Sequence, residues 1–195
     1  MQRYDIRHEK NDIRESIKLF RRQLDPELKK EYDNRIIESL KRLACYSNSK
    51  TIITYVSTDI EVDTHKLIKD SLKLGKRVAV PRCISKTRDM KFYYINSFDD
   101  LEKGTFSVYE PIPEKCEELK NYSHSICIVP ALSFDVLGYR LGYGKGYYDR
   151  FLSKYFGMKI GLCYNDCIKR KLPRGRFDIP VDVLITEKFT KRYNK

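Results

Sequence analysis

A glycine-rich segment with two cationic side chains offers the clearest chemistry in this sequence. Residues 129–152 read VPALSFDVLGYRLGYGKGYYDRFL and join a strand-like pattern to a helical one. Glycines let the backbone approach a ligand closely, consecutive N–H groups can surround an anion, and the helix start adds partial positive charge. Arg140 and Lys145 add two full charges. The composition fits a phosphate-binding loop, and it fits an ordinary glycine-rich surface turn equally well.

The spacing of these glycines matches neither common phosphate-binding fingerprint. A P-loop requires G-x-x-x-x-G-K-[ST], and a dinucleotide-binding turn requires G-x-G-x-x-G. This chain instead has G-x-x-x-G-x-G-x-G from Gly138 to Gly146. Glycine spacing alone therefore does not identify the ligand.

A longer motif in this segment resembles a known family. R-L-G-Y-G-K-G-Y-Y-D-R-F-L, preceded by V-P-A-L-S-F-D, is similar to the signature of the 5-formyltetrahydrofolate cyclo-ligases, also called methenyltetrahydrofolate synthetases. Further matching segments occur in the family's order: K-N-D-I-R at 10–14, D-I-E-V-D-T at 59–64, V-P-R at 80–82, E-P at 110–111, L-P-R-G-R-F-D-I-P-V-D at 172–182 and V-L-I-T-E at 183–187. The resemblance covers nearly the whole chain.

This resemblance implies an ATP- and Mg²⁺-dependent enzyme that closes 5-formyltetrahydrofolate to 5,10-methenyltetrahydrofolate, with release of ADP and phosphate. A formamide oxygen is a poor leaving group, so the γ-phosphoryl group of ATP is transferred to it. The neighbouring folate amine then attacks the activated carbon, and phosphate departs. Such catalysis depends mainly on positioning the reactants and neutralising charge.

The matching positions carry over the family's roles residue by residue. The implied ATP-binding residues are Lys10, Arg14, Arg140, Gly142, Gly144, Lys145, Gly146, Tyr147 and Tyr148. The implied folate-binding residues are Val56, Glu61, Tyr143, Gly144, Lys145, Gly146 and Tyr147. Arg140, Lys145 and Tyr147 are the implied catalytic residues, and Asp149 and Asp178 the implied Mg²⁺ carboxylates. Two carboxylates completed by phosphate and water oxygens suit this ion's octahedral preference.

The chain departs from the family pattern near its end. Cys167 stands where the family usually has a glutamine, and Arg176 and Phe177 stand where a glutamate and a histidine often precede the metal-binding aspartate. The assignment of Asp178 therefore depends on the flanking L-P and V-D. An inactive folate- or nucleotide-binding relative is the alternative that these departures leave open.

Each candidate also has an ordinary structural explanation. Lys10 and Arg14 could be solvated helix charges, and Asp149 could cap a helix or pair with an arginine. Asp178 could be a loop residue, Glu61 could merely precede a helix start, and Val56 fits strand core.

The elements expected around these residues indicate an α/β fold. Two helices come first, one from about Lys10 with Lys10, Arg14 and Arg21 on a shared basic side, and one opened by Asp25 and Pro26. Strands are expected at 51–56, 77–80, 90–95, 125–129, 159–164 and 183–186, with helices at 64–74 and 148–155. We therefore expect one domain over residues 1–195, with a largely parallel central sheet flanked by helices. The family resemblance implies a NagB/RpiA/CoA-transferase-like fold.

Charge and composition limit the partners. The chain has 39 basic and 27 acidic residues, a net charge of +12, which favours anionic ligands and makes a nucleic-acid-binding protein the less favoured alternative. No C-x-x-C pair, apolar membrane-length run or secretory pattern is present in the sequence. We expect a cytoplasmic monomer that binds ATP and 5-formyltetrahydrofolate, with or without a polyglutamate tail, and neither nucleic acid nor membrane.

Overall fold

The computed structural model describes residues 6–84, 87, 89–104 and 108–193. The helices are α1 (Ile6–Gln23), α2 (Pro26–Lys41), α3 (Ala44–Asn48), α4 (His65–Lys73) and α5 (Tyr147–Leu152). The strands are β1 (Thr51–Ile53), β2 (Arg77–Ile84), β3 (Asp89–Ile95), β4 (Leu101–Lys103), β5 (Tyr109–Pro111), β6 (Ser125–Val129), β7 (Ser133–Asp135), β8 (Arg140–Leu141), β9 (Met158–Leu162), β10 (Ile168–Lys169), β11 (Val183–Ile185) and β12 (Thr190–Arg192).

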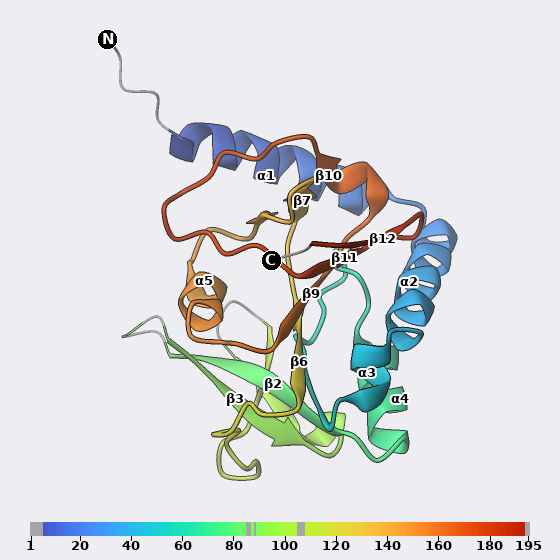
Figure 1. Ribbon diagram of the computed structural model, residues 1–195, viewed down its shortest axis with the longest axis vertical. Helices are drawn as coiled ribbons and strands as arrows, with labels where there is room; N and C mark the ends of the chain where they lie inside the picture. Colours follow the sequence, from blue (N-terminus) through green and yellow to red (C-terminus); the bar gives the residue numbers. More distant parts are fainter. Residues whose placement is uncertain (1–5, 85–86, 88, 105–107, 194–195) are drawn as a thin grey trace.

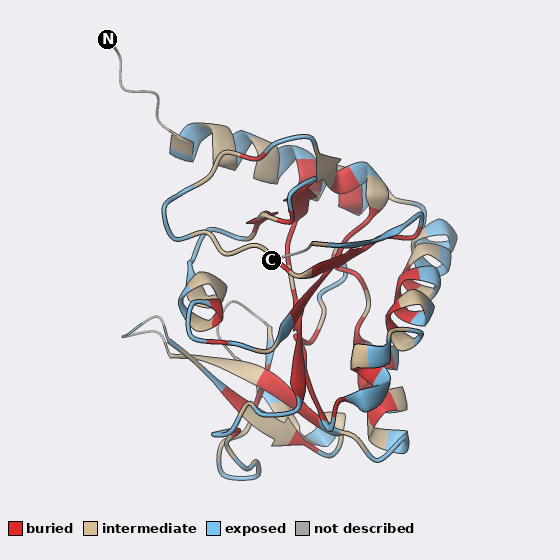
Figure 2. Ribbon diagram, in the orientation of Figure 1, coloured by how far each residue is buried: buried red, intermediate tan, exposed pale blue. Residues whose placement is uncertain are grey.

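A seven-stranded sheet forms the centre, in the order β12-β11-β9-β6-β1-β2-β3. The five strands from β11 to β2 pair in parallel, and β3 and β12 are antiparallel strands at the two edges. All five residues of β6 are buried, and Figure 2 shows this strand in the middle of the buried interior. The prediction of a largely parallel sheet flanked by helices is confirmed.

The helices lie on both sides of this sheet and across one end of it. In Figure 1, α2, α3 and α4 lie to the right of the sheet and α5 to the left, while α1 crosses above β7 and β10. Asp25 Oδ1 accepts hydrogen bonds from the backbone N–H groups of Glu27 and Leu28, both at 3.0 Å, which confirms the expected cap of α2. Since α1 contacts the segments that follow β1 and β6, it lies at the carboxyl ends of the parallel strands, where ligands of such sheets usually bind.

Among the features that were not predicted, two concern the surroundings of the site. The strand expected at 51–56 ends at Ile53 because the chain then turns away, and the Thr64 hydroxyl rather than a neighbouring strand donates to the Tyr55 carbonyl, at 2.7 Å. A small second sheet, β10-β7-β8, has strands of two or three residues, too short for a period-two pattern. It nevertheless carries Arg140, the first residue of the glycine-rich loop.

None of the helices in the described part of the chain has the length and apolar character that a bilayer crossing demands.

Candidate active site

Helix α1 contributes two of the predicted site cations, and each is tied to a different loop. The Lys10 ammonium forms an ion pair with Asp178 Oδ2 at 2.8 Å, and Arg14 Nε donates to the Gly142 carbonyl at 2.8 Å. Lys10 and Arg14 are four residues apart, so they lie on one helix face. These contacts overturn the alternative that both are simply solvated surface charges.

The glycine-rich loop needs its glycines for conformation and for close approach. Gly144 and Gly146 have φ angles of 88° and 78°, in the left-handed region that other residues adopt at a cost. A Cβ atom on Gly144 would lie 3.1 Å from Arg14 Cζ, so the missing side chain also makes room for the guanidinium. Lys145 is exposed between these two glycines. The loop therefore presents backbone and a cation to solvent beside α1, as a phosphate site requires.

Two carboxylates lie next to this loop, each paired with a cation. Asp149, in the first turn of α5, accepts from Arg140 Nη2 at 2.8 Å; the side chain of Asp149 is 28% exposed and that of Arg140 only 4%. Asp178 pairs with Lys10, and the same carboxylate oxygen, Oδ2, accepts from the Gly175 backbone N–H at 2.8 Å. Burial raises the pKa of Asp149, the Arg140 charge opposes this, and the Asp178 charge raises the pKa further. The two carboxylates are thus close enough for their charges to interact.

These two aspartates fit a magnesium site completed by other oxygens. Within residues 6–84, 87, 89–104 and 108–193, no group of three or more histidine, cysteine or acidic side chains could hold a metal ion. Magnesium often takes only one or two protein carboxylates and completes its octahedron with phosphate and water oxygens. The hard oxygen donors of Asp149 and Asp178 suit that arrangement.

The predicted folate carboxylate is buried beside the same loop. Glu61 is 6% exposed, and its Oε2 accepts from both the backbone N–H and the hydroxyl of Thr58 at 2.9 Å. Burial raises the pKa of the Tyr143 hydroxyl, and the negative charge of Glu61 raises it further. The structure therefore brings Glu61 and Tyr143 together from segments about eighty residues apart, as their predicted shared role requires.

Tyr148 places a buried hydroxyl in this region. The hydroxyl has no hydrogen-bond partner among the described residues. Burial raises the pKa of Tyr148, and the charges of Glu61 and Arg140 both act on it, in opposite directions. Because buried polar groups are normally satisfied, the unpaired Tyr148 hydroxyl favours a ligand or water contact.

Val56 packs in a small core cluster with Ile68, Val78, Val80 and Ile95. The structure thus gives its side chain a packing role, although it lies beyond β1 rather than within a strand. Its contact with folate stays a prediction, as does that of Tyr147.

A buried ion pair that sequence reasoning missed holds the segment that carries Asp178. Asp135 is fully buried, and its Oδ2 accepts from Arg174 Nη2 at 2.7 Å and Nε at 3.2 Å. Its Oδ1 accepts from the N–H groups of Leu137 and Tyr139. Both partners fall within the matched motifs, but a single sequence does not show that they pair.

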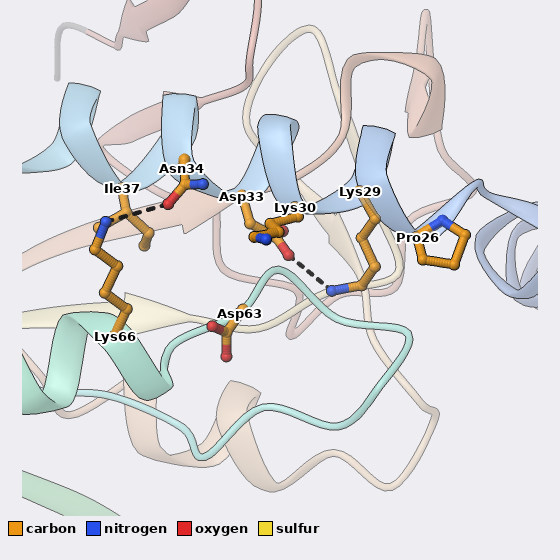
Figure 3. Close-up of a pocket in the computed structure, with 8 residues that line it drawn as sticks. All are labelled: Pro26, Lys29, Lys30, Asp33, Asn34, Ile37, Asp63 and Lys66. Carbon is orange, nitrogen blue, oxygen red and sulfur yellow. Dashed lines mark hydrogen bonds and ion pairs between the residues drawn. The ribbon is translucent and has the colours of Figure 1, made fainter.

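A groove of about 230 Å³ lies between α2 and the start of α4 (Figure 3). Its lining residues are Pro26, Lys29, Lys30, Asp33, Asn34, Ile37, Asp63 and Lys66. The Tyr164 hydroxyl contacts Asp33 Oδ1 of this groove at 2.7 Å and the Glu61 carbonyl at 3.1 Å. No predicted site residue lines this groove.

Comparisons with known proteins agree on one family. The model of the 5-formyltetrahydrofolate cyclo-ligase family matches residues 6–187. A probable 5-formyltetrahydrofolate cyclo-ligase of Caenorhabditis elegans is 27% identical over 93% of this chain and 94% of its own. The solved 5,10-methenyltetrahydrofolate synthetase of Aquifex aeolicus superposes with a TM-score of 0.84 at 34% identity, over 95% of this chain and 93% of that one. The solved 5,10-methenyltetrahydrofolate synthetase of Mycoplasma pneumoniae superposes with a TM-score of 0.74 at 26% identity, over 91% of this chain and 98% of that one.

Proposed function

The chain belongs to the 5-formyltetrahydrofolate cyclo-ligase family, and from this premise we propose how its residues close 5-formyltetrahydrofolate to 5,10-methenyltetrahydrofolate with ATP. The observation that carries the proposal is the position of the glycine-rich loop. It contacts Arg14 of α1 through Gly142 and approaches Glu61 through Tyr143. One loop can thus hold the phosphates of ATP on one side and the folate on the other.

In the proposed reaction the bonds form and break between the folate and ATP, and the protein mainly positions these reactants and neutralises charge. The formyl oxygen attacks the γ-phosphorus and ADP leaves; the second folate nitrogen then attacks the activated carbon and inorganic phosphate leaves. Lys10, Arg14 and Lys145 supply positive charge for the phosphates, and the backbone around Gly144 supplies close approach. Glu61 holds the folate by accepting hydrogen bonds from its ring N–H and amino groups.

We propose that Arg140 acts by positioning its neighbour, Asp149. Its side chain is almost entirely buried and is paired with Asp149, so it has little surface for a ligand. We assign it to holding Asp149 in place, whereas direct contact with ATP stays a prediction. Asp149 and Asp178 would hold Mg²⁺, which supplies neutralisation of the phosphate charge when bound.

The proposal also covers the domain organisation, oligomeric state, cellular compartment and substrate range of the protein. We propose one catalytic domain over residues 1–195 that works as a cytoplasmic monomer. The six cysteines are all free, as a reducing compartment favours. We also propose that folates with and without a polyglutamate tail are substrates.

A direct assay tests this function against the alternative of an inactive binding relative. Purified protein is mixed with 5-formyltetrahydrofolate, ATP and Mg²⁺, and the near-ultraviolet absorbance of the methenyl product is followed, with each component omitted in turn. Product formation that needs all three supports the enzyme. Folded protein that binds the folate but forms no product indicates the inactive relative, and salt-sensitive RNA or DNA binding without folate binding indicates the nucleic-acid alternative.

Lys10→Ala should raise the KM for ATP about tenfold and leave the KM for folate nearly unchanged. Lys10 is largely buried beside Asp178, where a lost charge-assisted contact costs about 1.5 to 3 kcal/mol. Lys18→Ala is the matched control because Lys18 lies two turns further along α1 and pairs only locally with Glu15. Steady-state kinetics with each substrate varied in turn measure both constants. Equal effects of the two variants would contradict the role of Lys10.

A further inference from the structure

Arg21 is a third cation on the basic side of α1, and it is buried in the core rather than exposed at the site. Only 3% of the surface of Arg21 is exposed to solvent. Nη1 donates to the Ile60 carbonyl at 3.1 Å, and Nη2 donates to the carbonyls of Ala131 and Leu132 at 3.0 and 2.6 Å. One guanidinium thus bridges the loop after β1 and the connection after β6.

This buried charge lies beside thiols rather than beside a carboxylate among the described residues. No carboxylate in the described part of the chain forms an ion pair with Arg21, and its Nε has no hydrogen-bond partner there. The Cys163 sulfur lies 3.6 Å from Nη2, and the Cys163 hydrogen bond together with the Arg21 charge lowers the pKa of the Cys167 thiol to about 7. Burying a cation without an opposite charge is costly. That cost is offset by the three backbone carbonyls to which the guanidinium donates, so these carbonyls indicate what the residue does.

The carbonyls that Arg21 holds belong to the two segments that build the proposed folate pocket. Ile60 directly precedes Glu61, and Ala131 and Leu132 directly precede β7, which leads into the glycine-rich loop. Tyr164 supports the same place from another side, because its hydroxyl donates to Asp33 and lies 3.1 Å from the Glu61 carbonyl. The Arg21 guanidinium lies 5.3 Å from the centre of the Tyr164 ring. The backbone carbonyls of Ile60 and Glu61 are therefore contacted by two side chains, Arg21 and Tyr164, that also contact each other.

We propose that Arg21 is a positioning residue that sets the Glu61 carboxylate for folate binding and aligns it with the glycine-rich loop. This inference rests on the proposed function. Arg21 does not touch the folate; it acts through Glu61, and Tyr164 supports it. Binding groups must be held to within a fraction of an ångström, so loosening this loop weakens folate binding before it affects ATP.

The test measures binding of 5-formyltetrahydrofolate by isothermal titration calorimetry without ATP, together with thermal stability and the KM for ATP. Arg21→Lys keeps the charge and removes the planar fork that reaches three carbonyls. Tyr164→Phe removes one hydroxyl and leaves the ring in the core. Lys159→Met is the control: Lys159 is a buried cation, 5% exposed and paired with Asp182 at 2.9 Å, away from the Glu61 loop.

We expect Arg21→Lys to raise the Kd for folate at least about tenfold and Tyr164→Phe about threefold, with the KM for ATP within about twofold of the wild type. Lys159→Met should lose stability and keep the wild-type Kd. A folded Arg21→Lys protein that binds folate as the wild type does would overturn the inference. Equal losses of folate and ATP binding would also overturn it. If Arg21→Lys does not fold, an unchanged Kd of Tyr164→Phe for folate would overturn it instead. Wild-type protein that fails to bind 5-formyltetrahydrofolate would instead refute the proposed function, and the inference with it.

Discussion

Replacing Asp149 by asparagine should lower kcat/KM by about 10²- to 10³-fold and raise the Mg²⁺ concentration needed for half-maximal activity. The loss has this size because one charged ligand near the transferred phosphoryl group is removed, and electrostatic groups at that place contribute on this scale. The structure gives Asp149 a neighbouring carboxylate, Asp178, and an ion pair with Arg140, and the Lys10 charge also acts on it. An asparagine keeps the shape of the side chain and an acceptor for Arg140, so the fold should remain.

Asp70→Asn is the matched control for this variant. Asp70 is 29% exposed and pairs with Lys41, so it resembles Asp149 in exposure and in ion pairing but lies in α4. Both variants should lose about 1 kcal/mol of unfolding free energy. Only Asp149→Asn should weaken binding of Mn²⁺, a spectroscopic substitute for Mg²⁺, to the protein–ATP complex. If the Mg²⁺ dependence of Asp149→Asn equals that of the wild type, Asp149 is not a metal ligand.

The pKa of Asp149 gives the same prediction a pH dependence. Burial raises this pKa above the ordinary aspartate value, so the carboxyl gains its proton earlier as the pH falls. A protonated Asp149 cannot serve as a metal ligand. The acidic decline in activity of the wild type should therefore begin at a higher pH than an ordinary aspartate would give, and rising Mg²⁺ should move it to lower pH.

Much of this fold was readable from local sequence because the signals were local. Asp25 and Pro26 mark the start of α2, and Gly75 follows the end of α4 with a positive φ of 73°. Gly138, Gly144 and Gly146 of the signature segment have positive φ angles, which glycine adopts most easily. The positions of β6 and β11 followed from short apolar runs between turn residues, because buried parallel strands have that pattern.

The parts that could not be predicted depend on contacts between distant segments. The pairing of Asp135 with Arg174 joins residues 39 apart, and nothing in the local sequence shows that Asp135 is buried. Helical spacing placed Arg21 on a shared basic side with Lys10 and Arg14, and it gave no sign that this arginine is buried. Its place in the core follows only once α1 is seen to cross the ends of the strands. The family motif named the site residues, but only the structure shows that Lys10, Arg14 and Arg21 serve different loops.

Glu61→Gln should raise the KM for 5-formyltetrahydrofolate about 100-fold while the KM for ATP stays within about twofold. The Glu61 carboxylate accepts two hydrogen bonds from Thr58 on one oxygen, and in our proposal the folate donates to the other. A glutamine that keeps the bonds to Thr58 must direct its NH₂ group toward the ligand, so a donor faces the N–H and amino donors of the pterin. Sites built to accept hydrogen bonds discriminate strongly when an acceptor is replaced by a donor.

Glu110→Gln serves as the control for that variant because Glu110 is equally buried, at 4% exposure, and accepts from the Cys83 backbone N–H. It should lose stability without a change in the folate KM. The comparison also settles which face of the glycine-rich loop binds which substrate. If Glu61→Gln impaired ATP alone, the nucleotide would lie on the Tyr143 side of the loop and the folate beside α1. Lys10 and Arg14 would then have to bind the folate instead of the phosphates.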